Sequence, residues 1–400
     1  MTELLVRCGV ADLALLERVL TAPQEHARPN RVVLAAHVAA ARPRFAEVTR
    51  QSGIPLLVDP QTFYWQDAQH GADAWAQLPF GEPELQRPSD LLSPARQSML
   101  VAACIDFQLS CGATALIPPY VHIDRENDGW IEVQVGLWRR TRRYLDQQDL
   151  ALPVVPVLAV GWRLLDRHTW HAGVDRLQRG LVDLEPAEIA LAASRVDQGS
   201  QPDQRLVGLV STIQQLRRQA PVLAWRQGVL GEAAVAAGAV GYETGIGWGE
   251  RCDLRQAMAA HRRPRVMDSI GARPVYIAAL RRSIPKRNLQ ALLGTRVGAN
   301  LLCMDYQCCS TGPTSLLGDA RAHALVSRGR TLNTLDRIDR HAWRWQHLAD
   351  IATAGLDVAD RINRIAASRP SVTKVDTAAL HAMQLVANNR RQTLLRRSAA

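Results

Sequence analysis

The sequence of 400 residues contains almost no lysine, since Lys286 and Lys374 are the only two among its 48 basic side chains. Arginine therefore carries nearly all of the positive charge, and the net charge is +10. Such an excess favours an anionic partner, for example a nucleic acid or a phosphorylated substrate. An arginine-rich genome composition would produce the same numbers, so the sequence supports both interpretations.

Long apolar runs are also missing. No stretch approaches the roughly 18 residues of a membrane span, and the first residues show no signal-peptide pattern. The seven cysteines are an odd number scattered over a large chain, which argues against a secreted disulfide framework. We therefore expect a cytoplasmic protein with reduced thiols.

Several catalytic motifs are absent as well. The chain has no HxH after its first strand, no HExxH and no GxSxG nucleophile elbow. These motifs support metal-hydrolase and serine-esterase functions, so both classes lose their usual evidence.

What the sequence does contain is an alternation of short apolar runs and amphipathic segments, which is typical of repeated βα units around a parallel sheet. Eight such units favour a (β/α)₈ barrel of the TIM type, with a doubly wound parallel sheet as the alternative. Segments 4–10 and 299–305 are further possible strands. The eight predicted strands are residues 31–38, 54–60, 113–121, 152–161, 188–194, 220–226, 239–245 and 273–280.

Beyond the barrel the pattern becomes wholly helical. We predict a barrel over residues 1–312 and a helical C-terminal appendage over 313–400. The connection 61–100 is long, polar and rich in Pro and Gly, and such connections are often functional.

Barrel enzymes place their catalytic residues at the carboxyl ends of the strands. Asp59 and Glu243 end two predicted strands and are the candidate catalytic residues, as a general acid/base or a carboxylate nucleophile. Each also has a structural interpretation, as a turn cap or a surface acid. The candidate substrate-binding residues are Tyr64, Tyr120, Asp124, Arg195, Arg226, Gly245 and Gly247.

The two glycines and Tyr64 are candidates for binding because of their sequence surroundings. Gly245 and Gly247 belong to the stretch "GYETGIGWGE", where glycines let the backbone approach a phosphate closely. Tyr64 stands in the run "FYW", which would either stack on a flat ring at the barrel mouth or anchor the long connection.

Three cysteines lie within seven positions, in the stretch "CMDYQCC". Together with His323 or His341 they would offer zinc four thiolate and imidazole ligands, although the first spacing is long and the second pair is adjacent. Buried inert thiols and a reactive thiol are the other interpretations. The candidate metal ligands are Cys303, Cys308, Cys309 and His323.

The stretches "RVVLAAHV", "SGIPLLVDPQTFYWQ" and "APVLAWRQGVLGEAAVAAGAVGYETGIGWGE" resemble the tRNA-guanine transglycosylase family over roughly residues 30–330. The resemblance implies a glycosyltransferase that exchanges a base in tRNA or DNA through a covalent glycosyl-enzyme intermediate. It places Glu243 at the nucleophile and Asp59 at the residue that engages the base. It also implies a zinc ion on the three cysteines and a histidine, and two partners, a nucleic acid and a small-molecule base.

Two other hypotheses remain open. One is a barrel enzyme for a small phosphorylated or carboxylated metabolite, held by Arg195, Arg226 and the glycine-rich stretch 245–250. The other is a barrel without catalytic activity whose basic surface binds nucleic acid.

Overall fold

The structure is a computed structural model that describes residues 2–21, 28–69, 73–165, 173–247, 249–260 and 274–399. Its largest sheet has eight parallel strands in the order β3-β2-β1-β8-β7-β6-β5-β4. These strands are β1 (Glu3–Cys8), β2 (Arg31–Ala35), β3 (Leu56–Asp59), β4 (His122–Ile123), β5 (Val157–Gly161), β6 (Ile189–Ser194), β7 (Val222–Ala224) and β8 (Gly241–Gly245).

The segment before β4 closes this sheet into a ring. Ala115 forms a parallel bridge with Leu57 of β3, and the next residue, Leu116, bridges to Val154 just before β5. The amide of Val155 donates to the Leu116 carbonyl at 2.8 Å. The two edges of the sheet are therefore joined, and the predicted (β/α)₈ barrel is confirmed over the doubly wound sheet.

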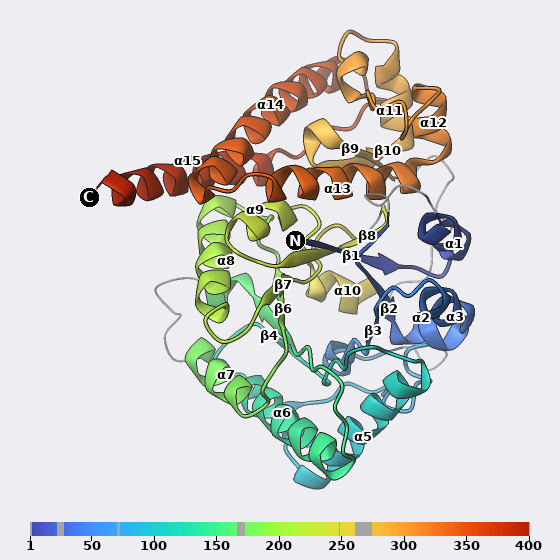
Figure 1. Cartoon of the computed structure of the whole chain (residues 1–400), viewed down its shortest axis with the longest axis vertical. Coiled ribbons are helices and arrows are strands. Elements are labelled where there is room, and N and C mark those ends of the chain that lie inside the picture. Colours follow the sequence, from blue (N-terminus) through green and yellow to red (C-terminus); the bar gives the residue numbers. More distant parts are fainter. Residues whose placement is uncertain are drawn as a thin grey trace.

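Apolar side chains explain why these segments form central strands. Val32, Val33 and Leu34 of β2 are fully buried, as are most residues of the other strands. Strands covered on both faces need such continuous apolar runs. The helices that surround the barrel in Figure 1 are α1 (Leu13–Thr21), α2 (Ala36–Ala41), α3 (Arg44–Gln51), α4 (Pro88–Leu91), α5 (Pro94–Ser110), α6 (Trp130–Gln147), α7 (Gly173–Val182), α8 (Pro202–Leu216), α9 (Gly231–Ala236) and α10 (Leu254–Ala260).

The number of barrel strands was predicted correctly, but the membership was not. Segment 4–10, which we held as a possible extra strand, contains β1. Segment 273–280, counted as the eighth strand, is outside the barrel in its described part, because β9 (Pro274–Ile277) pairs antiparallel with β10 (Arg282–Pro285). Segment 299–305 begins with a 3₁₀ turn, η6 (Gly298–Leu301), and contains no strand.

The C-terminal region has a hydrophobic core of its own. Val275, Ile284, Leu292, Leu316 and Ile362 belong to it, so it combines residues on both sides of position 312. The predicted domain limit at 312/313 remains a prediction. The elements of this region are the 3₁₀ turn η5 (Ala278–Leu280) and the helices α11 (Lys286–Leu293), α12 (Pro313–Gly318), α13 (Ala320–Asp336), α14 (His341–Ser368) and α15 (Ala378–Ala399).

Figure 1 places α13 between the barrel and the β9–β10 pair, with α14 and α15 packed together at one side. None of the described helices is long and apolar enough to cross a membrane.

Candidate functional site

A buried group of charged side chains lies at the carboxyl ends of β1, β3 and β8. Asp59 ends β3, Glu243 lies in β8, and both are fully buried. Arg7, the penultimate residue of β1, lies between them. Its Nη2 donates to Asp59 Oδ2 at 2.8 Å, and its Nε donates to Glu243 Oε1 at 2.8 Å. The fold therefore brings the two predicted catalytic carboxylates together through one guanidinium.

Arg226 and Tyr120 complete this group. Arg226 follows β7 with a left-handed φ of 58°, and its backbone N–H donates to Glu243 Oε2 at 2.9 Å. Its Nη2 lies 3.8 Å from Asp59 Oδ2. The hydroxyl of Tyr120 donates to Asp59 Oδ1 at 2.8 Å. We call Arg7, Asp59, Tyr120, Arg226 and Glu243 the central network.

The electrostatics of the central network keep Asp59 ionised. Burial by itself would raise the pKa of Asp59, but the charges of Arg7 and Arg226 lower that pKa below its usual value. Burial, followed by the charge of Asp59, raises the pKa of Tyr120 well above 10, so its hydroxyl stays protonated as a donor. The network contains two cations and two carboxylates, which balance to a net charge of zero.

Two donors of the central network have no acceptor. Arg7 Nη1 and Arg226 Nε are buried, and neither has a hydrogen-bond partner among the described residues. A buried polar group left unpaired costs about 1–3 kcal/mol. The network can therefore bind an acceptor, and an anionic oxygen would satisfy a guanidinium best.

A second charged group lies at the ends of β4, β5 and β6. Asp124, two residues after His122 along the chain, pairs with Arg163 at 3.5 Å and more closely with Arg255 of α10. Arg195, which follows β6 with a φ of 65°, has its Nε 3.7 Å from Asp253. Both predicted residues, Asp124 and Arg195, are thus at the same end of the barrel as the central network.

The other predicted substrate-binding residues are Tyr64, Gly245 and Gly247. Tyr64 is 6% exposed and packs between Phe63 and Trp75, and the charges of Arg226 and Asp59 act on it. Gly247 has a φ of 88°, and a Cβ there would lie 2.7 Å from Pro274 Cγ. Gly245 donates its N–H to the Gly249 carbonyl at 3.3 Å, so the stretch folds back on itself.

Arg7 was missed by the sequence analysis. It lies in "ELLVRC", and this segment was held only as a possible extra strand. A lone charged residue in an apolar strand is a signal that could have identified it, because a buried charge must be paired.

The candidate metal ligands also come together. Cys303, Cys308, Cys309 and His323 each offer one ligand atom, and all four atoms lie within 4.8 Å of one another. The cysteines lie between η6 and α12, and His323 is in α13. His323 Nδ1 is 3.4 Å from Cys308 Sγ and 3.5 Å from Cys309 Sγ, and the two sulfurs are 3.9 Å apart.

These distances suit a tetrahedral zinc ion. Bonds of about 2.3 Å to sulfur and about 2.0 Å to nitrogen place two sulfurs about 3.8 Å apart and a sulfur and a nitrogen about 3.5 Å apart. His323 Nε2 is 3.1 Å from the Tyr276 carbonyl, which can only accept. The proton therefore lies on Nε2, and the lone pair of Nδ1 faces the cysteines, as in typical metal-binding histidines.

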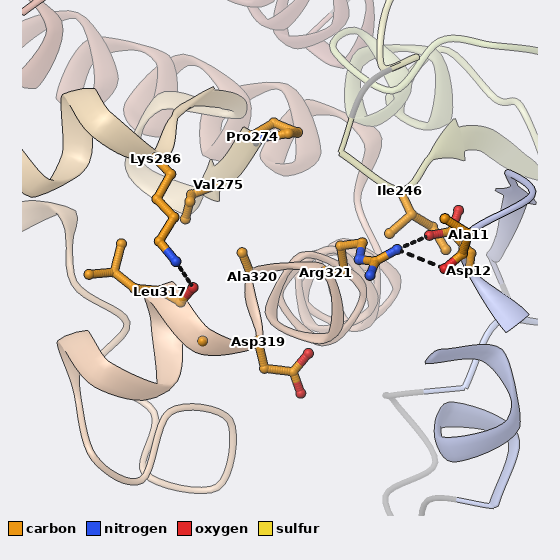
Figure 2. A pocket seen from close by; sticks show the side chains of 11 residues that line it. Ala11, Asp12, Ile246, Pro274, Val275, Lys286, Leu317, Asp319, Ala320 and Arg321 are labelled. Atoms are coloured by element: carbon orange, nitrogen blue, oxygen red, sulfur yellow. Dashed lines mark hydrogen bonds and ion pairs between the residues drawn. The ribbon is translucent and has the colours of Figure 1, made fainter. Parts of the chain in front are cut away.

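A separate cavity of about 340 Å³ lies between the barrel and the C-terminal region. Figure 2 shows partners for Lys286, Arg321 and Asp12 in this cavity, and the remaining charged side chain, Asp319, pairs with Arg18 at 2.6 Å. Lys286 Nζ donates to the Leu317 carbonyl at 2.9 Å, and Arg321 pairs with Asp12. The Arg321–Asp12 pair joins the C-terminal region to the barrel, whereas the Lys286–Leu317 bond lies within the C-terminal region.

Comparison with known proteins gives no family for the chain. No protein-family model matches, and no curated protein matches. Among solved structures, 2,3-dimethylmalate lyase, a PEP mutase/isocitrate lyase superfamily member, matches in two crystal forms. The triclinic form has 13% identity and a TM-score of 0.35 over 65% of this chain and 80% of that one. The trigonal form has 14% identity and a TM-score of 0.34 over 65% and 78%.

A thiamine phosphate pyrophosphorylase from Pyrococcus furiosus matches with 10% identity and a TM-score of 0.31, over 65% of this chain and 94% of that one. These values are too low to transfer a substrate or a mechanism. They do correct the family resemblance: these neighbours are not tRNA-guanine transglycosylases, and no sequence comparison supports that family. The nucleophile and base-binding roles of Glu243 and Asp59 in base exchange rested on the resemblance and lose that support.

Proposed function

We propose that the chain is a barrel enzyme acting on a small phosphorylated or carboxylated metabolite, with an anionic group of the substrate bound by Arg7 and Arg226. The observation that carries this proposal is the pair of buried guanidinium N–H groups without an acceptor among the described residues. They lie at the carboxyl ends of the strands, where barrel enzymes bind their substrates.

Asp59 and Glu243 support the arginines in this proposal. Each carboxylate accepts at least two N–H or O–H donors of the network, so the Arg7 guanidinium is held in one orientation, and the Arg226 guanidinium lies 3.8 Å from Asp59. Donors fixed in this way stabilise negative charge that develops on a substrate, because they need no reorganisation during the reaction. Tyr120, protonated and hydrogen-bonded to Asp59, keeps that carboxylate in place.

The test is a panel of small phosphate esters and carboxylic acids, with binding measured by calorimetry and turnover by mass spectrometry. Arg226→Asn is the informative variant, since asparagine tolerates the left-handed backbone that Arg226 adopts. We expect it to weaken binding at least tenfold, because a hydrogen bond to a charged group contributes about 1.5–3 kcal/mol.

Arg143→Gln is the matched control, because Arg143 is an exposed arginine of α6 outside the barrel mouth. Arg143→Gln removes one positive charge, as Arg226→Asn does, and this variant should bind the panel as the wild type does. The proposal fails if no anion of the panel binds, or if Arg226→Asn and Arg143→Gln bind the same ligand equally well.

We also propose that Cys303, Cys308, Cys309 and His323 bind one zinc ion. Support comes from the sulfur and nitrogen distances and from the acceptor on His323 Nε2. Elemental analysis of protein purified without chelator should give about one zinc per chain, and Cys303→Ser should lose most of it. Cys111→Ser, at the end of α5, is the control that removes a thiol elsewhere. Equal zinc in all three proteins would refute the assignment.

A further inference from the structure

Three arginines lie together on the β5–β6 side of the barrel mouth, two of them over the ring of Trp162. Arg163 lies in the 3₁₀ turn η3 (Trp162–Leu165) after β5, Arg195 follows β6, and Arg205 is in α8. The guanidinium carbon of Arg205 lies 3.8 Å from the centre of the Trp162 ring, and that of Arg163 lies 4.9 Å from it. We call Arg163, Arg195 and Arg205 the rim arginines.

The rim arginines hold one another in place through the backbone. Arg205 Nη1 donates to the Arg195 carbonyl at 3.1 Å and also contacts the Gln198 carbonyl. Arg195 itself is fixed by its own N–H, which donates to the Cys252 carbonyl at 2.7 Å. Two of the three rim arginines, Arg195 and Arg205, are therefore positioned by backbone hydrogen bonds.

Carboxylates only partly balance this positive charge. Asp124 is shared between Arg163 and Arg255, and Asp253 lies 3.7 Å from Arg195. Among the described carboxylates, the one that acts on Arg205 is Asp197, and Asp197 already pairs with Arg251 at 2.8 Å. Burial, followed by the charges of Arg195 and Arg163, lowers the pKa of Arg205. Grouped like charges cost stability, and an anionic ligand would offset that cost.

Two buried side-chain nitrogens on this side of the barrel mouth are unpaired among the described residues. Arg205 Nε is buried and has no hydrogen-bond partner among the described residues. The same holds for Nε2 of His122, a side chain only 3% exposed that precedes Asp124 by two positions. Burial lowers the pKa of His122 to about 4, so its imidazole is neutral at pH 7. A neutral imidazole and an arginine N–H are both suited to a phosphate oxygen.

We propose that the rim arginines form a phosphate subsite, and that the substrate is a phosphate monoester whose other end carries the carboxylate or carbonyl oxygen bound by the central network. The second part rests on the function proposed above. The spacing supports it, because β6 and β7 are neighbours and Arg195 and Arg226 follow their ends. Adjacent strands are about 4.8 Å apart, so a molecule of metabolite size can reach both groups.

The subsite can be tested with inorganic phosphate as the probe, titrated calorimetrically into the full-length protein. Arg163→Gln is the main variant, since a side chain that is 52% exposed can be replaced without disturbing the core. Arg205→Gln is the second variant, and Arg143→Gln is the control. We expect either rim variant to weaken phosphate binding at least tenfold and the control to leave it unchanged. No binding by the wild type, or equal binding by all four proteins, would overturn the subsite.

Titrations with the substrate panel and with a single-stranded RNA distinguish failure of the subsite from failure of the proposed function. If the substrate panel is bound and turned over with no effect of Arg163→Gln or Arg205→Gln, the proposed function stands and the subsite is wrong. If phosphate binding depends on the rim arginines but no metabolite binds, the subsite stands and the proposed function is wrong. A single-stranded RNA that binds through the rim arginines more tightly than phosphate monoesters would overturn the assignment to a small molecule.

Discussion

Replacing Arg7 with methionine tests whether the central network is held together by one buried guanidinium. The substitution keeps an apolar stem of similar length but leaves Asp59 and Glu243 fully buried without the donor that joins them. Removing one partner of a buried ion pair costs about 3–5 kcal/mol, since the remaining charge is uncompensated. We therefore expect Arg7→Met to lower the free energy of unfolding by about that amount at pH 8.

The stability lost in Arg7→Met should be larger at high pH than at low pH. In the wild type the folded pKa of Asp59 is lowered, so its contribution to stability is present above the unfolded pKa of about 3.9 and is lost as the pH falls through the folded pKa. In Arg7→Met the effect of burial on Asp59 is opposed by Arg226 without Arg7, so the folded pKa of Asp59 is higher than in the wild type. The penalty is then largest at pH 8 and decreases toward pH 5 as Asp59 binds a proton.

Urea unfolding followed by tryptophan fluorescence measures both effects, and the Trp225 ring centre lies 5.5 Å from the Arg7 guanidinium. Adding Asp59→Asn and Glu243→Gln to Arg7→Met should restore at least half of the lost stability, because the buried charges are then removed together. Arg143→Gln should change stability by less than about 0.5 kcal/mol. A loss below about 1 kcal/mol, or a loss that is the same at pH 8 and pH 5, would refute the reasoning.

Three other perturbations follow from the structure. Gly247→Ala should lower stability by about 1–3 kcal/mol in thermal unfolding, because its φ is 88° and its Cβ would meet Pro274 at 2.7 Å; an unchanged midpoint would contradict this. Arg328→Met should cost about 3–5 kcal/mol in the same assay, since this fully buried arginine donates to Glu250 at 2.6 Å, and adding Glu250→Gln should recover part of the loss. Extracting metal with a chelator should lower the unfolding midpoint of the wild type and leave that of Cys303→Ser unchanged.

The barrel was predictable because its signal is spread over many residues. Eight short apolar runs separated by amphipathic segments identify parallel strands even when single assignments fail. The segment 273–280 failed because the described part, "PVYIAAL", is apolar for another reason: Val275 and Ile277 are buried in the second core, which the sequence alone cannot separate from the first. Strand β1 was undervalued because Arg7 interrupts its apolar run.

The four possible metal ligands come together in space although the spacing of the cysteines in the sequence did not suggest it. Four residues separate Cys303 from Cys308, and Cys309 is adjacent, which looked awkward for one ion. The structure accommodates this spacing because the segment turns at Asp305, whose carbonyl accepts the N–H of both Cys308 and Cys309, at 3.2 and 2.7 Å. His323 then arrives from α13. A turn held by its own backbone carbonyls cannot be inferred from cysteine spacing.

The central network explains why the strand-end carboxylates alone could not identify the chemistry. Read from the sequence, Asp59 and Glu243 are two acids at a barrel mouth, a pattern that suits a nucleophile, a proton carrier or a binding group equally well. In the structure each of them accepts hydrogen bonds from Arg7, and Glu243 also accepts the backbone N–H of Arg226. Their lone pairs are thus used to orient donors, while the unpaired N–H groups belong to the arginines. This geometry is the support for the proposed recognition of a negative charge, and Arg226→Asn is the substitution that tests that proposal.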